Sequence, residues 1–209
     1  MSAAGGSADQ WGKDLSAHAR RGLWRPLLSA LGVTVHTRAA DAKAANCAAG
    51  AKGEQLTAAL LAPLESAGWT VLHDRAIPGA ARANADHIVI TPAGRVYVID
   101  SKLWSAKKGH GLVHAQDGRL WHGHRYADKA IDSLLYEARL AERALGVPVQ
   151  PLVAVHNAPV QDGRFVVRDV PVLTAGLLVQ ALVMNDGPRD PGAGSLARRA
   201  VVVLPPYPR

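Results

Sequence analysis

Residues 84–102, NADHIVITPAGRVYVIDSK, place two apolar segments on either side of a Thr-Pro-Ala-Gly-Arg turn. Short apolar runs rich in Val and Ile around such a turn predict a β-hairpin. Apolar residues occupy both alternating sets of positions in the two segments, which is typical of central strands covered on both faces. A chain with this hairpin at its centre is therefore expected to form a sheet with helices packed on both sides.

The turn also fixes which residues of the hairpin face each other. If the hairpin folds about Ala93, paired positions sum to 186, so Asp86 lies opposite Asp100 and Asn84 lies opposite Lys102. Side chains alternate across a strand, so Asp86, Asp100 and Lys102 are expected on the same face. The sequence therefore predicts two carboxylates and one ammonium group close together in a largely apolar hairpin.

Two facing carboxylates repel each other, and burial adds a desolvation penalty to each. A lysine would offset one charge, whereas a divalent cation accepts oxygen ligands from both carboxylates. Mg²⁺ held in this way can polarise a phosphoryl oxygen and acidify a bound water, and an adjacent ammonium can stabilise the transition state. The simpler alternative is an Asp–Lys ion pair near a strand end, with both aspartates reaching solvent.

The segments around the hairpin predict the order helix, three strands, helix, strand. A helix with Glu54 and Gln55 in its first turn ends at Gly68, and a strand follows at 69–77. Beyond the hairpin, the segments indicate two short strands across the Asp117-Gly118 turn, a helix over about 126–145, and a buried strand at 150–156. The expected fold class is α/β, with a mixed central sheet flanked by helices.

The two ends of the chain add further predicted elements. Residues 1–49 are expected to form a basic helical extension, with a helix over 9–32, followed by an Ala-rich linker or an extension of the next helix. Residues 50–183 would form the main domain, and 184–209 a loop and a terminal strand, AVVVLP, packed on that domain.

Composition narrows the class of partner. A net charge of +7 and a pI of about 9.9 favour polyanions, so nucleic acid is the first partner to test. The single cysteine, Cys47, and the absence of a signal-like start or a long apolar segment predict a cytoplasmic protein without a membrane span. Trp104 and Trp121 would either pack in the core or stack on bases.

The run GEQ, the hairpin NADHIVITPAGRVYVIDSK, the later DGRLWHGHR and the following helix resemble the nuclease-related domain, NERD. The resemblance covers about residues 50–157 and extends more loosely to 183. That family is placed in the PD-(D/E)xK, or restriction-endonuclease-like, superfamily, which implies an αβββαβ core. Ala85 precedes Asp86 where the superfamily name has proline.

The resemblance implies a role for each candidate residue. Asp86 and Asp100 would hold Mg²⁺, which Mn²⁺ could replace, and the Ser101 carbonyl would be a further ligand. Lys102 would be the catalytic lysine, and Glu54 an acid at the edge of the site. Supporting roles would fall to Asn84 and to Glu137, which stands where the family commonly has glutamine. Candidate DNA contacts are the basic residues Arg20, Arg21, Arg25, Lys107, Lys108, Arg125 and Lys129.

The sequence therefore predicts a Mg²⁺-dependent nuclease that hydrolyses DNA phosphodiester bonds, with an endonucleolytic mode favoured. The alternative is a nuclease-like DNA-binding module with weak or no cleavage. A protein that lies on a membrane surface through its N-terminal helix is a third class. A homodimer is one assembly that the sequence leaves open.

Overall fold

The structure, a computed structural model, describes residues 35–80, 84–106 and 111–208. The predicted helix at 9–32, with Arg20, Arg21 and Arg25, lies outside the described residues, as do Lys107 and Lys108.

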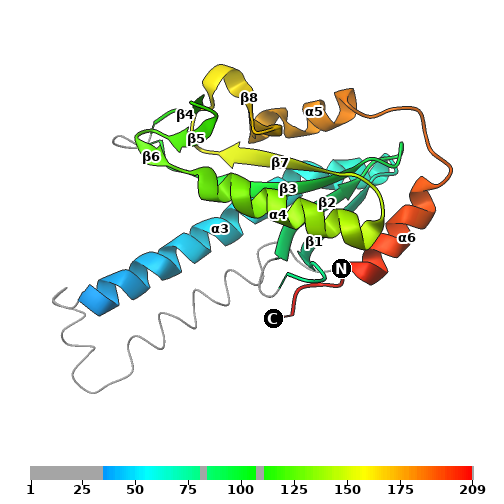
Figure 1. The fold of residues 1–209 in the computed structure, drawn as a ribbon, viewed down its shortest axis with the longest axis horizontal. Helices are drawn as coiled ribbons and strands as arrows, with labels where there is room; N and C mark the ends of the chain where they lie inside the picture. The colour runs from blue at the N-terminus through cyan, green and yellow to red at the C-terminus, as the bar shows by residue number, and fades with distance from the viewer. Residues whose placement is uncertain (1–34, 81–83, 107–110, 209) are drawn as a thin grey trace.

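A mixed sheet with the strand order β1-β2-β3-β7-β9-β8 forms the centre of the molecule (Figure 1). Strands β1 to β3 are antiparallel neighbours, β3, β7 and β9 are parallel, and β8 returns antiparallel to β9. The strands are β1 (Thr70–Ala76), β2 (Asn84–Ile90), β3 (Val96–Leu103), β7 (Val149–His156), β8 (Arg164–Val167) and β9 (Val170–Thr174). This arrangement confirms the α/β prediction and is consistent with a restriction-endonuclease-like fold.

Helices cover both faces of this sheet. On one face, α4 (Asp128–Leu145) buries an apolar stripe against β3 and β7, in a core cluster where Ile88 of β2 and Val98 of β3 are completely inaccessible to solvent. On the other face, α3 (Val35–Ser66) and α5 (Leu178–Met184) pack against Val89 and Ile99. Figure 1 shows α4 in front of the sheet and α3 behind it. The hairpin strands are thus covered on both sides, as their sequence predicts.

The helix before β1 includes the Ala-rich segment, which is one of the two alternatives that the sequence predicts. It begins at Val35, so Glu54 and Gln55 lie well inside it and not in its first turn. Residues 39–52 are rich in Ala, which has the highest helix propensity, so the segment continues the helix. Gly53 brings α3 against the end of β3, because a Cβ there would lie 3.2 Å from the Leu103 Cβ and 3.7 Å from the Ser101 carbonyl oxygen.

The predicted terminal strand is wrong, because its residues end a helix, α6 (Ala193–Val203). Only one side of this segment is buried, through Leu196 and Ala200, while Val202 is 76% exposed, so its apolar residues follow a helical and not a strand period. After α6, the chain forms a bridge from Pro206 to Arg75 at the edge of β1. The Arg75 guanidinium donates to carbonyls at the end of α6.

A small antiparallel sheet, sheet B, lies beyond the ends of β3 and β7. It consists of β4 (Val113–Gln116), β5 (Arg119–His122) and β6 (Arg125–Tyr126). The first two strands and the Asp117-Gly118 turn confirm the prediction, whereas β6 occupies the expected first residues of α4. In the described part of the chain, no helix has the length and apolar character needed to cross a membrane.

Candidate active site

The β2–β3 hairpin has the register that its turn predicts. His87 pairs with Ile99, Ile88 with Val98, Val89 with Tyr97, and Ile90 with Val96, so paired positions sum to 186. The next pair in this register is Asp86 with Asp100, where the strands no longer pair through their backbones. Instead, the Ser101 N–H donates to Asp86 Oδ2 at 2.9 Å. Asp86 therefore remains attached to β3 through its carboxylate.

Lys102 lies beside Asp100 on the same face of β3. Its Nζ donates to Asp100 Oδ1 at 2.7 Å, and the two side chains are 27% and 16% exposed. The second oxygen, Asp100 Oδ2, is buried and has no hydrogen-bond partner among the described residues. A buried carboxylate oxygen without a donor is costly in free energy. Asp100 Oδ2 is therefore an acceptor to which a cation or a water could bind.

Glu137, on the face of α4 that points at β3, joins this group. Burial, followed by the charges of Asp100 and Asp86, raises the pKa of Glu137 to about 8. Burial and Asp100 likewise raise the pKa of Asp86 to about 7, with Lys102 acting in the opposite direction. Burial lowers the pKa of Lys102, but the nearby Asp100 and Asp86 outweigh it, so that pKa is raised overall. The site therefore favours an added positive charge.

Sequence reasoning missed Asp74 as a neighbour of this site. It lies in β1 opposite Asp86, between the paired positions His73–His87 and Arg75–Ala85, and it is completely inaccessible to solvent. Its φ is +50°, and the Asn84 amide donates to its Oδ1 at 2.7 Å. The charge of Asp74 contributes to the raised pKa of Asp86.

A signal for Asp74 was present in the sequence, because the predicted strand WTVLHDRAI carries its one aspartate in a polar His-Asp-Arg run. Its placement also depends on the end of the chain. The Tyr207 N–H donates to the Asp74 carbonyl at 2.8 Å, and the Ala76 N–H donates to the Pro205 carbonyl at 2.8 Å. The segment after α6 therefore holds the backbone of β1 on both sides of Arg75.

A chain of hydrogen bonds runs behind the carboxylates, on the α3 face of the sheet. It joins His73 Nδ1 to His87 Nδ1 (2.7 Å), His87 Nε2 to Ser101 Oγ (3.1 Å), Ser101 Oγ to Thr57 Oγ1 (2.8 Å), and Thr57 Oγ1 to His156 Nε2 (2.8 Å). His87 thus packs on the face opposite Asp86, as strand alternation predicts.

The direction of this chain follows from one bond. Since Ser101 donates its hydroxyl proton to Thr57, it must accept from His87 Nε2–H, so neutral His87 accepts from His73 at Nδ1. Thr57 then donates to His156. Burial lowers the pKa of all three histidines, which agrees with neutral rings. The side chain of Ser101 is therefore fixed from behind while its N–H holds Asp86.

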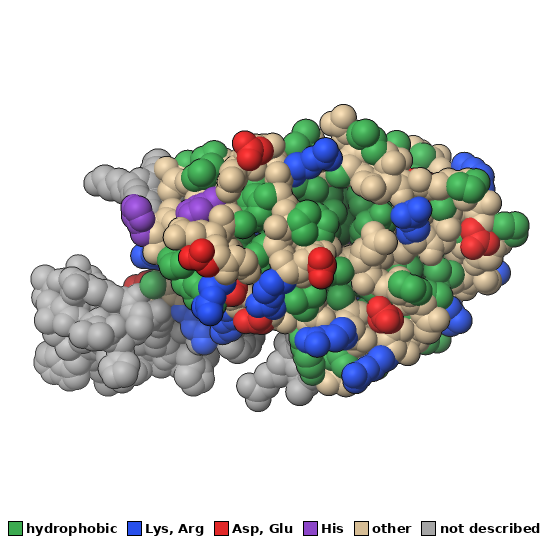
Figure 2. All heavy atoms as spheres, turned by 45° about the horizontal axis from the view of Figure 1, so that its top comes forward, with side chains coloured by type: hydrophobic (Ala, Val, Ile, Leu, Met, Phe, Trp, Pro, Cys, Tyr) green, Lys and Arg blue, Asp and Glu red, His purple; other side chains and the backbone are tan. Residues whose placement is uncertain are grey.

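The other predicted residues lie around this centre. Glu54 is 6% exposed and lies on α3, next to the close contact of Gly53 with the end of β3. Arg125 and Lys129 are exposed, on β6 and in the first turn of α4. On the face drawn in Figure 2, Lys and Arg side chains are interspersed with Asp and Glu, so this face has no continuous basic surface.

The donor set suits a hard cation that keeps part of its water shell. Asp86, Asp100 and the Ser101 carbonyl offer oxygen ligands, and Asp100 Oδ2 has no donor to displace. No three His, Cys, Asp or Glu side chains among the described residues are grouped to hold a metal alone. Mg²⁺ commonly binds through one or two carboxylates plus waters, so the residues present fit this ion.

Comparison with known proteins supports a relationship for the central part of the chain. Residues 49–156, more than half of the chain's 209 residues, match the family model NERD, described as the nuclease-related domain. No curated protein and no solved structure matched. The matched span begins within α3 and ends with β7, so it contains Asp74, Asp86, Asp100, Lys102 and Glu137.

Proposed function

Because this chain belongs to the nuclease-related domain family, within the PD-(D/E)xK superfamily, we propose that it is a Mg²⁺-dependent nuclease that hydrolyses DNA phosphodiester bonds, with endonucleolytic cleavage favoured. One observation carries the proposal. Asp86, Asp100 and Lys102 meet on one face of the hairpin, and Asp100 Oδ2 is buried without a hydrogen-bond donor. An ion pair formed only for stability would not leave the second Asp100 oxygen buried without a donor, and it would not need the facing Asp86.

In this proposal, Asp86, Asp100 and the Ser101 carbonyl hold the metal. The bound ion would polarise the phosphoryl group and acidify a water, as divalent ions do in phosphodiester hydrolysis. Ser101 keeps Asp86 oriented through its N–H, and Asp100 holds the Lys102 ammonium at 2.7 Å. The ammonium orients the attacking water and stabilises the negative charge that develops on the phosphate.

Glu137 and Glu54 have supporting roles in the proposal. Glu137 retains a proton at neutral pH in the metal-free protein, because its pKa is raised to about 8. Its ionised form raises the pKa of Lys102, so the two groups lie close enough for Glu137 to help to orient the ammonium. Glu54 lies at the α3 side of the hairpin, where a carboxylate can act through water.

A plasmid-cleavage assay tests the proposal. Purified protein is incubated with supercoiled and linear plasmid in Mg²⁺, Mn²⁺ or EDTA, beside the variants Asp100→Asn and Asp169→Asn. Asp169 is an exposed turn residue with φ of +62°, which asparagine tolerates, so it controls for the same chemical change away from the site.

We expect metal-dependent nicking of the supercoiled plasmid by the parent and by Asp169→Asn, and a loss of at least about a hundredfold for Asp100→Asn. Equal cleavage by Asp100→Asn, or the same cleavage in EDTA, would refute the assigned site. DNA binding without cleavage in any metal would favour the alternative of a nuclease-like binding module.

A further inference from the structure

The two faces of sheet B have different surroundings. The paired residues Val113 and His122 face the core, together with Leu120, and all three are buried. The opposite face carries a row of rings across all three strands, because His114 pairs with Trp121 and Trp121 pairs with Tyr126. Gln116 and Arg119 form the next pair along this face. We call these five residues (His114, Gln116, Arg119, Trp121 and Tyr126) the outer face of sheet B.

The rings of the outer face are held in place although they border solvent. Tyr126 is 53% exposed, and Trp121 meets it edge to face at a centroid separation of 5.6 Å. The Arg119 guanidinium lies 5.4 Å from the centre of the Tyr126 ring and donates to its hydroxyl. That hydroxyl in turn donates to the buried carboxylate of Asp128. Such fixed rings lose little conformational entropy when a planar group stacks on them.

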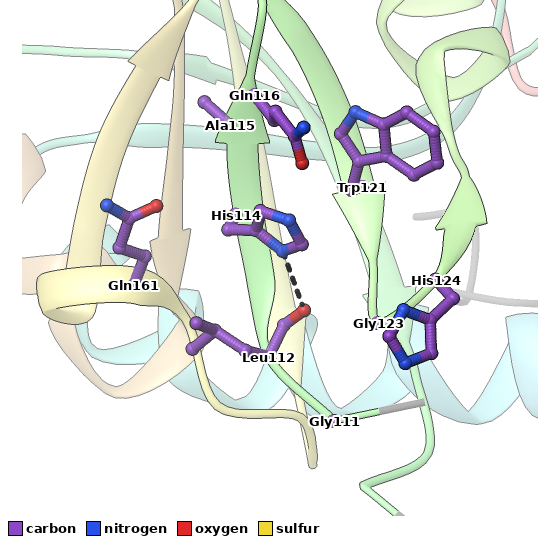
Figure 3. A pocket seen from close by; sticks show the side chains of 9 residues that line it. All are labelled: Gly111, Leu112, His114, Ala115, Gln116, Trp121, Gly123, His124 and Gln161. Atoms are coloured by element: carbon purple, nitrogen blue, oxygen red, sulfur yellow. Dashed lines mark hydrogen bonds between the residues drawn. The ribbon is translucent and has the colours of Figure 1, made fainter. Parts of the chain in front are cut away.

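The outer face borders an open hollow of about 860 Å³ (Figure 3). Trp121, His114 and Gln116 line it from β4 and β5, with His124 and Gln161 at its margins. Since His114 Nδ1 points at the Leu112 carbonyl at 3.3 Å, that nitrogen carries a proton and Nε2 is an acceptor when the ring is neutral. The two glutamine amides can both donate and accept. These groups match the mixed donors and acceptors on the edges of nucleobases.

Sheet B is also attached to both elements that carry the candidate active site. Trp104, directly after β3, stacks on His122 with a centroid separation of 4.9 Å and an interplanar angle of 11°. Asp128, at the start of α4, accepts from the Leu120 N–H at 2.7 Å. A strand held on the outer face would therefore have a fixed position relative to Lys102 on β3 and Glu137 on α4.

We propose that the outer face of sheet B binds a single-stranded stretch of nucleic acid. Bases would stack on Trp121 and Tyr126, His114 and Gln116 would contact base edges, and Arg119 would contact the phosphates. Aromatic side chains beside cationic groups are the recurring means of binding single strands without sequence preference. The net charge of +7 supports a polyanionic ligand. The bound strand would be part of the nuclease substrate, and only this part of the inference rests on the proposed nuclease function.

Binding can be tested without cleavage. Fluorescence anisotropy in EDTA measures the affinity for a labelled oligothymidylate and a labelled oligouridylate of about 15 nucleotides, and for a DNA duplex of the same length. The two single strands share the phosphates and the base edges that form hydrogen bonds but differ in the sugar and in one base methyl group, so comparing them shows whether the deoxyribose or the ribose strand is preferred. The variants are Trp121→Leu, Trp121→Phe and Arg119→Gln, and Arg198→Gln on α6 is the matched control for an exposed arginine.

We expect tighter binding of at least one single strand than of the duplex. Trp121→Leu should weaken it at least about fivefold, since one stacked base contributes roughly that much, while Trp121→Phe should retain most of the affinity. Arg119→Gln should weaken binding and reduce its salt dependence, and Arg198→Gln should change neither.

Tighter binding of the duplex, or unchanged single-strand affinity in both Trp121→Leu and Arg119→Gln, would overturn the inference. Far-UV circular dichroism identifies a Trp121 variant that fails to fold, and Arg119→Gln then decides the outcome. Loss of plasmid cleavage in Asp100→Asn with unchanged single-strand binding separates the two proposals. A protein that binds single strands through Trp121 but cleaves no DNA would support this inference and refute the nuclease proposal.

Discussion

Replacement of Thr57 by valine should break the hydrogen-bond chain that supports the site from behind. Thr57 is completely inaccessible to solvent, accepts from the Ser101 hydroxyl and donates to His156 Nε2, each at 2.8 Å. Valine has nearly the same shape, so the substitution removes the hydroxyl without opening a cavity. It leaves a buried donor at Ser101 and an acceptor at His156 without their partners.

The expected loss of unfolding free energy follows from these two bonds. A buried donor left without an acceptor costs about 1–3 kcal/mol. His156 is only partly buried, so water can replace its lost donor and its contribution is small. We therefore expect Thr57→Val to destabilise the protein by about 2 kcal/mol. Thr57→Ser keeps the hydroxyl and loses one methyl group, which costs about 1 kcal/mol.

Urea unfolding of the metal-free protein, followed by circular dichroism, measures these differences. The parent should be the most stable, Thr57→Ser intermediate and Thr57→Val the least stable, with similar urea dependence in all three proteins. A Thr57→Val protein as stable as the parent, or more stable than Thr57→Ser, would show that the hydroxyl is not required. It would also show that the hydrogen bonds of Thr57 to Ser101 and His156 contribute little to stability.

Two further predictions concern the carboxylates and the C-terminal segment. Because the pKa of Glu137 is raised to about 8 from 4.5, the stability that its protonated form supplies below pH 4.5 is lost as pH rises to 8. Relative to the parent, the metal-free Glu137→Gln protein should therefore become more stable by about 1–3 kcal/mol as pH rises from 5 to 8.5. Urea unfolding of both proteins at each pH measures this change. A difference in unfolding free energy that stays constant with pH would contradict the raised pKa. Arg75→Gln should lower the unfolding free energy by about 2 kcal/mol or more, since buried hydrogen bonds to the Leu204 and Val201 carbonyls are lost. An exposed arginine variant, Arg198→Gln, should unfold like the parent, and equal midpoints for the two variants would argue against this contact.

The hairpin shows why part of the site could be predicted from the sequence. Its register depends on a short turn and on alternation, and both are local properties of residues 84–102. The facing positions of Asp86 and Asp100 and the shared face of Lys102 follow from that pattern. Glu137 was named only through the resemblance to the nuclease-related domain, in which a polar residue of the long helix faces the site.

The errors have a different physical origin. The run AVVVLP contains strand-forming residues, but it packs as the end of α6 because the core contacts follow a helical spacing, at Leu196, Ala200 and Leu204. The placing of Glu54 and Gln55 in the first turn of α3 is a second error, because the Ala-rich segment extends this helix back to Val35. In α6, tertiary contacts decided the outcome against local strand preference, whereas the helix propensity that extends α3 is itself a local property.

The sequence by itself determined the α/β class, the hairpin register and the meeting of two aspartates with a lysine, because turn chemistry and side-chain periodicity act over a few residues. Only the tertiary structure placed Asp74 beside Asp86, joined Thr57 and His156 to Ser101, and turned the row from His114 to Tyr126 toward solvent. Thr57 and His156, for example, are 99 positions apart in sequence. Contacts of this kind depend on how helices and sheets pack, and no local pattern in the chain records that packing.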